Sequence, residues 1–179
     1  VCETPFPSMP IYFWGDKDGG KYHNAYFAKF KEKWTHGDYI SINQMGGVRI
    51  FGRSDATLNP GGVRIGTSEI YKVVEKIDGI LDSVAISKNI DGDEKILLFV
   101  KMSKELDSKI NNLIKQSLRQ ECSPKHIPYK IFKVDDIPYT LNGKKIELAI
   151  KKTIDGDEVS NKSSIVNPES LKYFKNISI

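Results

Sequence analysis

The stretch of the chain that decides the fold is Gly52-Arg53-Ser54-Asp55-Ala56-Thr57-Leu58-Asn59-Pro60-Gly61-Gly62-Val63-Arg64-Ile65-Gly66-Thr67-Ser68-Glu69-Ile70-Tyr71. Its centre, Asn59-Pro60-Gly61-Gly62, favours a turn, because proline presets φ and glycine accepts a positive φ. Thr67 then offers an N-cap oxygen to a helix, with Glu69 in the first turn. The pattern predicts that a strand enters, a glycine loop turns and a helix leaves. These residues alone fit an ordinary connection between two elements equally well.

The two ends of this stretch resemble the hinge motif of the adenylate-forming acyl-CoA synthetases. The matching residues are Gly52-Arg53-Ser54-Asp55 and Gly62-Val63-Arg64-Ile65-Gly66-Thr67-Ser68-Glu69-Ile70. The amino-acid sequence of residues 55–71 is most similar to the branch of the family that activates acetoacetate. The resemblance covers nearly the whole chain, but only the C-terminal part of such an enzyme.

The resemblance implies an α+β fold in three parts. Residues 1–53 are expected to be the C-terminal end of the large N-terminal adenylation domain, with a helix and a β-hairpin. Residues 54–152 are expected to form the small C-terminal lid domain, a three-stranded sheet with packed helices. Residues 153–179 are expected to be a C-terminal tail. The missing part of the adenylation domain would be the partner of this chain.

The composition predicts a folded, soluble piece of a longer protein. Of 179 residues, 39% are hydrophobic and 28% are charged, which suits a buried core and argues against disorder. No apolar run approaches a membrane span, and Val1 is followed by no signal peptide. Cys2 and Cys122 are the only thiols, which favours a reducing compartment, and we expect the cytoplasm. The net charge of +4 comes without an arginine-rich run, so no nucleic acid or membrane partner is expected.

The first part of the chain is rich in aromatic residues. Residues 25–34 have helical spacing, with four aromatic side chains on one side, and predict an amphipathic helix. Its apolar face would pack on a core or on the missing domain. The alternating runs 39–42 and 48–51, joined by Gly46-Gly47, predict a two-stranded ribbon.

The second part alternates between helical and strand patterns, and the third ends in a short helix. The predicted elements are a helix over 66–77, strands over 80–87 and 95–102 joined by Asp91-Gly92, a helix over 103–119 capped by Ser103, a strand over 129–134, a short helix with Ile146, Ala149 and Ile150, and a short helix over 168–174. Leu171, Tyr173 and Phe174 would form an apolar patch that docks on the missing domain, although a disordered tail is the alternative.

A second motif lies in the loop Pro138-Tyr139-Thr140-Leu141-Asn142-Gly143-Lys144. On its own, such a sequence is an ordinary exposed turn, and it is not a P-loop because no Ser or Thr follows Lys144. It resembles the last core motif of the family, Pro-x-Thr-x-(Ser/Asn)-Gly-Lys, in which the lysine is catalytic. The resemblance therefore makes Lys144 the catalytic residue, with the neighbouring Lys145 as the alternative.

The implied reaction explains why a lysine is needed. When a carboxylate attacks the α-phosphate of ATP, negative charge accumulates on the phosphoryl and bridging oxygens. A compact cation on a mobile loop stabilises that charge in the transition state, and a point charge suffices. The family uses ATP, Mg²⁺ and coenzyme A, and the Mg²⁺ would be bound mainly by the missing domain.

The nucleotide and coenzyme A contacts are also implied by the resemblance. Asp38, in His36-Gly37-Asp38, matches the aspartate that accepts hydrogen bonds from the ribose hydroxyls of ATP, although an ordinary turn acid fits the residues alone. The family usually has Thr or Ser where this chain has His36, which we interpret as a surface histidine without an assigned role. Arg53 matches the second residue that contacts the nucleotide.

The lid is expected to swing about Asp55, so that one surface replaces another at the nucleotide. Gly61 and Gly62 would then face coenzyme A, with Arg64 beside them to contact phosphates or hold the loop. Arg119 is a weaker candidate for a coenzyme A phosphate, and a helix-dipole role suits it equally. The rival hypothesis is a non-enzymatic phosphate- or nucleic-acid-binding module that uses the glycine loop and Lys144-Lys145.

Overall fold

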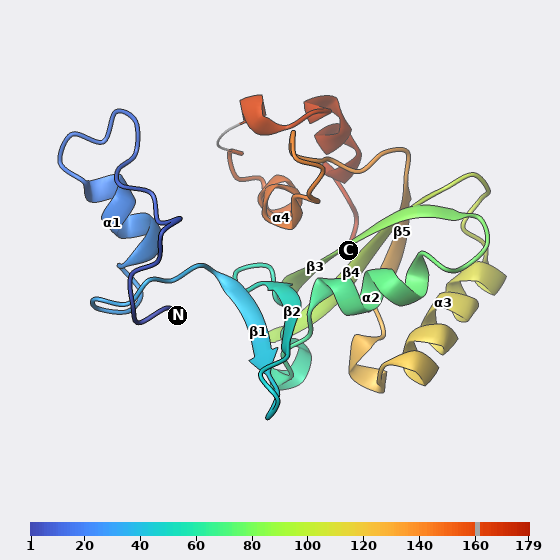
Figure 1. Cartoon of the computed structure of the whole chain (residues 1–179). Coiled ribbons are helices and arrows are strands. Elements are labelled where there is room, and N and C mark those ends of the chain that lie inside the picture. The colour runs from blue at the N-terminus through green and yellow to red at the C-terminus, as the bar shows by residue number, and fades with distance from the viewer. Residues whose placement is uncertain (160–161) are drawn as a thin grey trace. The chain divides into compact units, whose positions relative to one another are not determined.

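The computed structural model describes residues 1–159 and 162–179. By its own contacts the chain divides into two compact units, Val1–Asp38 and Tyr39–Ile179 (Figure 1). The predicted domain limits after residues 53 and 152 stay predictions.

The first unit contains the helix α1 (Gly20–Tyr26). The carboxylate of Asp16 accepts hydrogen bonds from the backbone N–H groups of Lys21 and Tyr22, at 3.0 and 2.8 Å. These bonds satisfy N–H groups at the helix N-terminus, which have no partner inside the helix. The prediction of a helix over residues 25–34 is therefore wrong in position, because only its first two residues are helical.

Trp34 is the centre of the first unit and explains where the helix ends. Its backbone pairs with Cys2 in both directions, at 2.9 and 3.1 Å, which extended backbone can do and a helix cannot. The indole ring is 4% exposed, and the ring of Tyr26 stacks on it at 3.7 Å. The aromatic spacing thus reflects a compact ring cluster rather than one face of a helix.

The second unit begins with a two-stranded ribbon of β1 (Asp38–Ile42) and β2 (Val48–Arg53), as predicted. The turn η1 (Pro60–Gly62) follows, and then the helix α2 (Thr67–Val74). A side chain at Gly66 would overlap the carbonyl oxygen of Phe51, so only glycine allows this approach between strand and helix. Gly66, not Thr67, is the N-cap, and its N–H donates to Glu69.

The main sheet has three strands in the order β3 (Ile80–Ile90), β4 (Asp93–Met102) and β5 (Lys130–Val134). β3 and β4 are antiparallel and joined at Asp91-Gly92, where both residues have positive φ. β5 is parallel to β4, with Leu97 opposite Lys130 and Lys101 opposite Val134. The predicted three-stranded α+β unit is confirmed.

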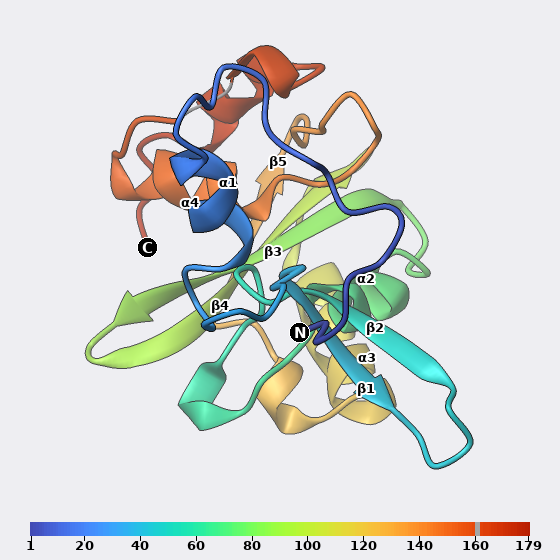
Figure 2. The same cartoon turned by 60° about the vertical axis from the view of Figure 1, so that its left-hand side comes forward.

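Helices cover both faces of the sheet, so the central strand β4 is buried on both sides (Figure 2). The first face packs against α2 and α3 (Ser108–Glu121), and the second against α4 (Glu147–Asp155) and the tail. The predicted cap Ser103 is wrong. Asp107 caps α3, because its carboxylate accepts from the N–H of Ile110 at 2.8 Å.

The described part of the tail belongs to the core of the second unit. It contains the 3₁₀ turns η3 (Lys162–Ser164) and η4 (Pro168–Phe174). Phe174 is fully buried, with its ring 5.0 Å from that of Phe99 in β4. Leu171 is also buried, so these two side chains are not available to dock on another domain, and that prediction is wrong for them. The disordered alternative is wrong for residues 162–179 as well, and residues 160 and 161 lie outside the described chain.

Across the described residues, no helix is both long enough and apolar enough to span a lipid bilayer.

Candidate functional site

The loop that carries Lys144 is a tight turn stabilised by its own backbone. The N–H of Thr140 donates to the carbonyl of Lys144, and the N–H of Gly143 donates to the carbonyl of Thr140, both at 2.9 Å. The hydroxyl of Thr140 also accepts from the N–H of Lys144 at 3.1 Å. Gly143 has a φ of 69°, which favours glycine. The defined positions of the motif thus shape the turn, and the side chain of Lys144 is left exposed.

The neighbouring Lys145 points into the unit instead. Its Nζ forms ion pairs with Glu75 and, at 2.8 Å, with Asp82, and donates to the carbonyl of Ser83 at 2.6 Å. The same Nζ lies 4.1 Å from the centre of the Tyr71 ring. Only 16% of the Lys145 side chain is exposed, so Lys144 is the lysine of this pair that can meet a second molecule.

Two partly buried tyrosines connect Lys145 to the rest of this region. The hydroxyl of Tyr139 donates to Asp82 at 2.7 Å, and the hydroxyl of Tyr71 donates to Glu147 at 2.9 Å. Burial raises the pKa of both tyrosines, and the neighbouring carboxylates raise it further. Both hydroxyls therefore stay protonated near neutral pH and act as fixed donors.

The glycine loop lies at the other end of the sheet. Gly61 and Gly62 have φ of 56° and 81°, and the N–H of Gly61 donates to Asp93 at 3.2 Å. Hydrogen bonds from Lys95 and then from Gly61 lower the pKa of Asp93. A Cβ on Gly61 would fall 2.5 Å from Nζ of Lys125, so this lysine lies directly on the glycine loop. Lys125 is a charged neighbour that the sequence analysis missed, since only the fold brings it there.

The two loops are separated by the length of β4. Asp93 begins β4 beside the glycine loop, whereas Lys101 near its end pairs with Asp136 at 2.7 Å, in the segment that leads to Lys144. Eight positions in a strand correspond to roughly 27 Å. Figures 1 and 2 show the same separation, with the teal turn η1 below the sheet and the segment between β5 and α4 above it.

The remaining predicted residues lie at the ends of the ribbon or on exposed positions. Arg53 ends β2 and pairs with Asp55, the predicted hinge, at 3.2 Å in the turn that follows. Asp38 begins β1 and lies 3.5 Å from His36, which accepts a hydrogen bond from the Trp34 indole. Arg64 is exposed in the glycine loop. Arg119 is exposed in the last turn of α3, and no hydrogen bond or ion pair among the described residues joins it to that loop.

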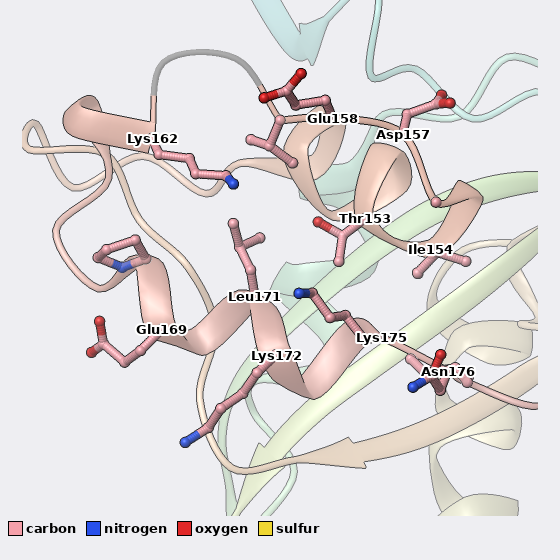
Figure 3. A pocket seen from close by; sticks show the side chains of 14 residues that line it. Thr153, Ile154, Asp157, Glu158, Lys162, Glu169, Leu171, Lys172, Lys175 and Asn176 are labelled. Atoms are coloured by element: carbon pink, nitrogen blue, oxygen red, sulfur yellow. The ribbon is translucent and has the colours of Figure 1, made fainter.

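A cavity in the second unit shares none of these residues. It has a volume of about 610 Å³ and lies between the end of α4 and the tail. Figure 3 shows Leu171 at its centre, with Lys162 and Lys175 extending toward it from either side. No cluster of residues able to hold a metal ion is found within residues 1–159 and 162–179.

Comparison with known proteins gives matches along nearly the whole chain, although no family model matches it. It is 54% identical to an acetoacetyl-CoA synthetase of Caenorhabditis elegans, over 97% of the chain and 26% of that protein. It is 47% identical to an acetoacetyl-coenzyme A synthetase of Rhizobium meliloti, over 97% of the chain and 27% of that protein. The chain thus spans about a quarter of the length of the curated relatives it matches.

Solved structures give a similar result. Acetoacetyl-CoA synthetase from Streptomyces lividans matches with a TM-score of 0.89 and 38% identity, over 97% of the chain and 27% of that structure. ATP-bound MatB from Rhodopseudomonas palustris matches over 80% of the chain and 28% of that structure, with a TM-score of 0.64. At 20% identity, the second match shows a shared fold alone.

Proposed function

The chain belongs to the adenylate-forming acyl-CoA synthetases, and we propose that it is the lid-bearing segment of an AMP-forming acetoacetate–CoA ligase. The whole enzyme would convert acetoacetate, ATP and coenzyme A into acetoacetyl-CoA, AMP and diphosphate through an acyl-adenylate. Such a ligase would use Mg²⁺ and work in the cytoplasm. One observation carries the proposal: an exposed lysine on a rigid turn and a glycine loop lie at opposite ends of one buried strand.

In the first half-reaction, Lys144 would meet the phosphates of ATP. Its side chain is exposed while its backbone is held by the turn, so the charge can reach a neighbour from a fixed base. The ammonium group of Lys144 would stabilise the charge that develops as the carboxylate oxygen bonds to the α-phosphate and diphosphate leaves. Acetoacetate, diphosphate and the adenine pocket would be handled by the missing adenylation domain.

In the second half-reaction, the glycine loop would take the place of Lys144. Gly61 and Gly62 carry no side chains, so a long ligand can pass close to their backbone. Arg64 and Lys125 add positive charge beside them, which suits the phosphates of coenzyme A. Arg119 remains a weaker candidate for the same ligand, because its position on α3 supports only a helix-end role.

The hinge and the ribose contacts complete the proposal. Asp55 lies in the turn between β2 and the glycine loop, where rotation of a few backbone angles would turn the sheet and both loops together. Asp38 and Arg53 would contact the ribose of ATP from the ends of the ribbon strands. A carboxylate that accepts two donors side by side is suited to the two ribose hydroxyls.

The test is Lys144→Ala in the full-length enzyme, with each half-reaction measured separately. We expect diphosphate release to fall by about 10²- to 10³-fold, since a group that stabilises transition-state charge is removed. Thioester formation from supplied acetoacetyl-adenylate should stay within about threefold, because Lys144 would be withdrawn in that step. Lys109→Ala, an equally exposed lysine on α3, is the matched control and should leave both rates unchanged.

Two results would overturn the proposal. One is an equal loss of both half-reactions in Lys144→Ala. The other is tight binding of polyanions by the isolated chain with a steep salt dependence, which the rival phosphate-binding module predicts.

A further inference from the structure

The loop that carries Lys144 is held from one side by Asn167, a residue of the tail. The Asn167 side-chain oxygen accepts from the N–H of Tyr139 at 3.0 Å. Its amide nitrogen donates to Asp136 at 2.6 Å and to the carbonyl of Ile137 at 2.9 Å. One amide thus satisfies three groups of the loop, and this donor and acceptor pattern fixes the orientation of the amide.

The backbone of the tail pairs with the same loop. The N–H of Leu141 donates to the carbonyl of Ser164 at 3.1 Å, and the N–H of Val166 donates to the carbonyl of Tyr139 at 2.9 Å. Thr140 and Ile165 form an antiparallel bridge between these two bonds. The tail is therefore paired with the loop through an isolated β-bridge and the two hydrogen bonds beside it.

The opposite side of the loop is held by the sheet. The side chain of Tyr139 donates to Asp82 of β3, the carboxylate that also pairs with Lys145. Asp136 pairs with Lys101 of β4. Burial acts to raise the pKa of Asp136, but the hydrogen bonds from Lys101 and Asn167, with smaller contributions, together outweigh it, so the pKa is lowered. The backbone before Lys144 is thus fixed between the sheet and the tail, while its side chain remains outside.

We propose that Asn167 is a positioning residue for Lys144. The inference rests on the proposed function, because it assigns to the tail the placement of the lysine that function requires. Loss of the Asn167 amide would leave the N–H of Tyr139, the carbonyl of Ile137 and one oxygen of Asp136 without this partner. The loop would relax, and a shift of about 1 Å at a reacting group can reduce a rate about 10²-fold.

The experiment compares Asn167→Ala with the paired exchange Asn167→Asp with Asp136→Asn in the full-length enzyme. We expect Asn167→Ala to lower kcat for diphosphate release by about 10- to 100-fold. The KM for ATP and the rate of thioester formation from supplied adenylate should each stay within about threefold, because Lys144 is proposed to stabilise charge that develops only in the transition state of adenylation. Asn167→Asp alone places two carboxylates together and should also lose kcat. The exchange again joins positions 136 and 167 through one donor and one acceptor and keeps an acceptor for the Tyr139 N–H. It leaves the Ile137 carbonyl without its donor and replaces the Lys101–Asp136 ion pair by a neutral hydrogen bond, so it should recover part of the lost kcat.

Leu171→Ala is the matched control in the same tail. Leu171 is buried in the core and makes no hydrogen bond to the loop through its side chain. This variant should lower Tm without favouring one half-reaction over the other. A structural role of Asn167 alone predicts the same pattern for Asn167→Ala.

The outcomes separate the two proposals. If Lys144→Ala abolishes adenylation and Asn167→Ala does not, or lowers both half-reactions equally, the positioning role is wrong and the function stands. If Lys144→Ala leaves adenylation intact, the proposed function itself fails. If Asn167→Ala does not fold, the paired exchange decides, since a folded exchange variant with unrecovered kcat contradicts the pairing.

Discussion

The two ends of β4 are built in different ways. At the Lys101 end, partly buried charges and the Tyr139 hydroxyl connect β3, β4 and the loop that carries Lys144. At the Asp93 end, the base of the glycine loop is closed by two backbone hydrogen bonds between the buried residues Leu58 and Ile65. Its tip reaches β4 through the hydrogen bond from Gly61 to the partly exposed carboxylate of Asp93, beside the flexible side chain of Lys125. A side chain that must deliver a charge needs a fixed base, whereas a backbone that a long ligand passes needs open space. The difference in construction matches the two tasks that we propose for these loops.

The largest expected loss of stability comes from a substitution at the Lys101 end of β4. Lys145→Met leaves Glu75 and Asp82 close together without their cation, and removing one partner of a buried ion pair costs about 3–5 kcal/mol. Because Glu75 is partly exposed, we expect the free energy of unfolding to fall by about 2–4 kcal/mol. Urea unfolding monitored by circular dichroism gives this quantity.

Lys144→Met is the matched control for that measurement. The side chain of Lys144 is exposed, so its replacement should change the free energy of unfolding by no more than about 0.5 kcal/mol. An equal fall in the free energy of unfolding in Lys144→Met and Lys145→Met would contradict the assignment of an exposed side chain to Lys144 and an ion-paired one to Lys145.

A smaller effect is expected at the Asp93 end. Gly61 has a φ of 56°, and forcing alanine into that region costs about 1–2 kcal/mol. Gly61→Ala should lower the free energy of unfolding by that amount. It should also slow thioester formation in the full-length enzyme, because a methyl group would enter the face that we propose for coenzyme A. Thermal unfolding and the two half-reaction assays measure these changes.

Gly92→Ala provides the comparison for Gly61→Ala. Gly92 has a φ of 80° in the β3–β4 turn, and nothing lies within 4 Å of a Cβ placed there. Gly92→Ala should lower the free energy of unfolding by a similar amount, without a selective loss of thioester formation. A selective loss in both variants would mean that the glycine loop has no special role.

The smallest effect is a pH dependence confined to the Asp93 end. His126, in the turn η2 (Pro124–His126), follows Lys125, and its buried Nε2 has no hydrogen-bond partner among residues 1–159 and 162–179. Burial lowers the pKa of His126, while Glu69 acts weakly against this. Between the folded pKa and the unfolded value of about 6.5, the unfolded chain binds more protons. Stability therefore falls as the pH drops through that window.

Hydrogen exchange at several pH values, corrected for intrinsic rates, measures this effect. Protection of backbone amides near His126 should decrease on acidification from about pH 7.5 to 5.5, and protection near Tyr139 should change less. His126→Asn should flatten the response, since the titrating ring is removed while an acceptor for Ser123 remains. An unchanged response in His126→Asn would assign the effect to another group.

Local patterns predict the parts of the fold that depend on neighbours in sequence. The Asp91-Gly92 turn, the buried run 96–100 and the glycine loop before α2 all follow from turn preferences and spacing. The helix predicted over 25–34 was wrong because Trp34 pairs with Cys2, far away in the chain. Helical spacing of aromatic residues cannot show such a contact.

The candidate site divides in the same way. The motif residues around Lys144 and Gly61 could be identified from sequence, because they share one loop each. Asn167 and Lys125 could not, since only the folded chain brings them to those loops. Polar residues in a tail or turn are common, and no local signal distinguishes these two from solvent-exposed ones.

Burial of β4 on both faces has a mechanical consequence. A strand between two packed cores cannot bend without opening one of them, so its ends must travel together as a single rigid body. Rotation about a pivot near Asp55 that brings one end inward carries the other outward. Mutually exclusive occupancy of the nucleotide site would then be a property of the geometry, and the order of the two chemical steps would need no separate timing signal.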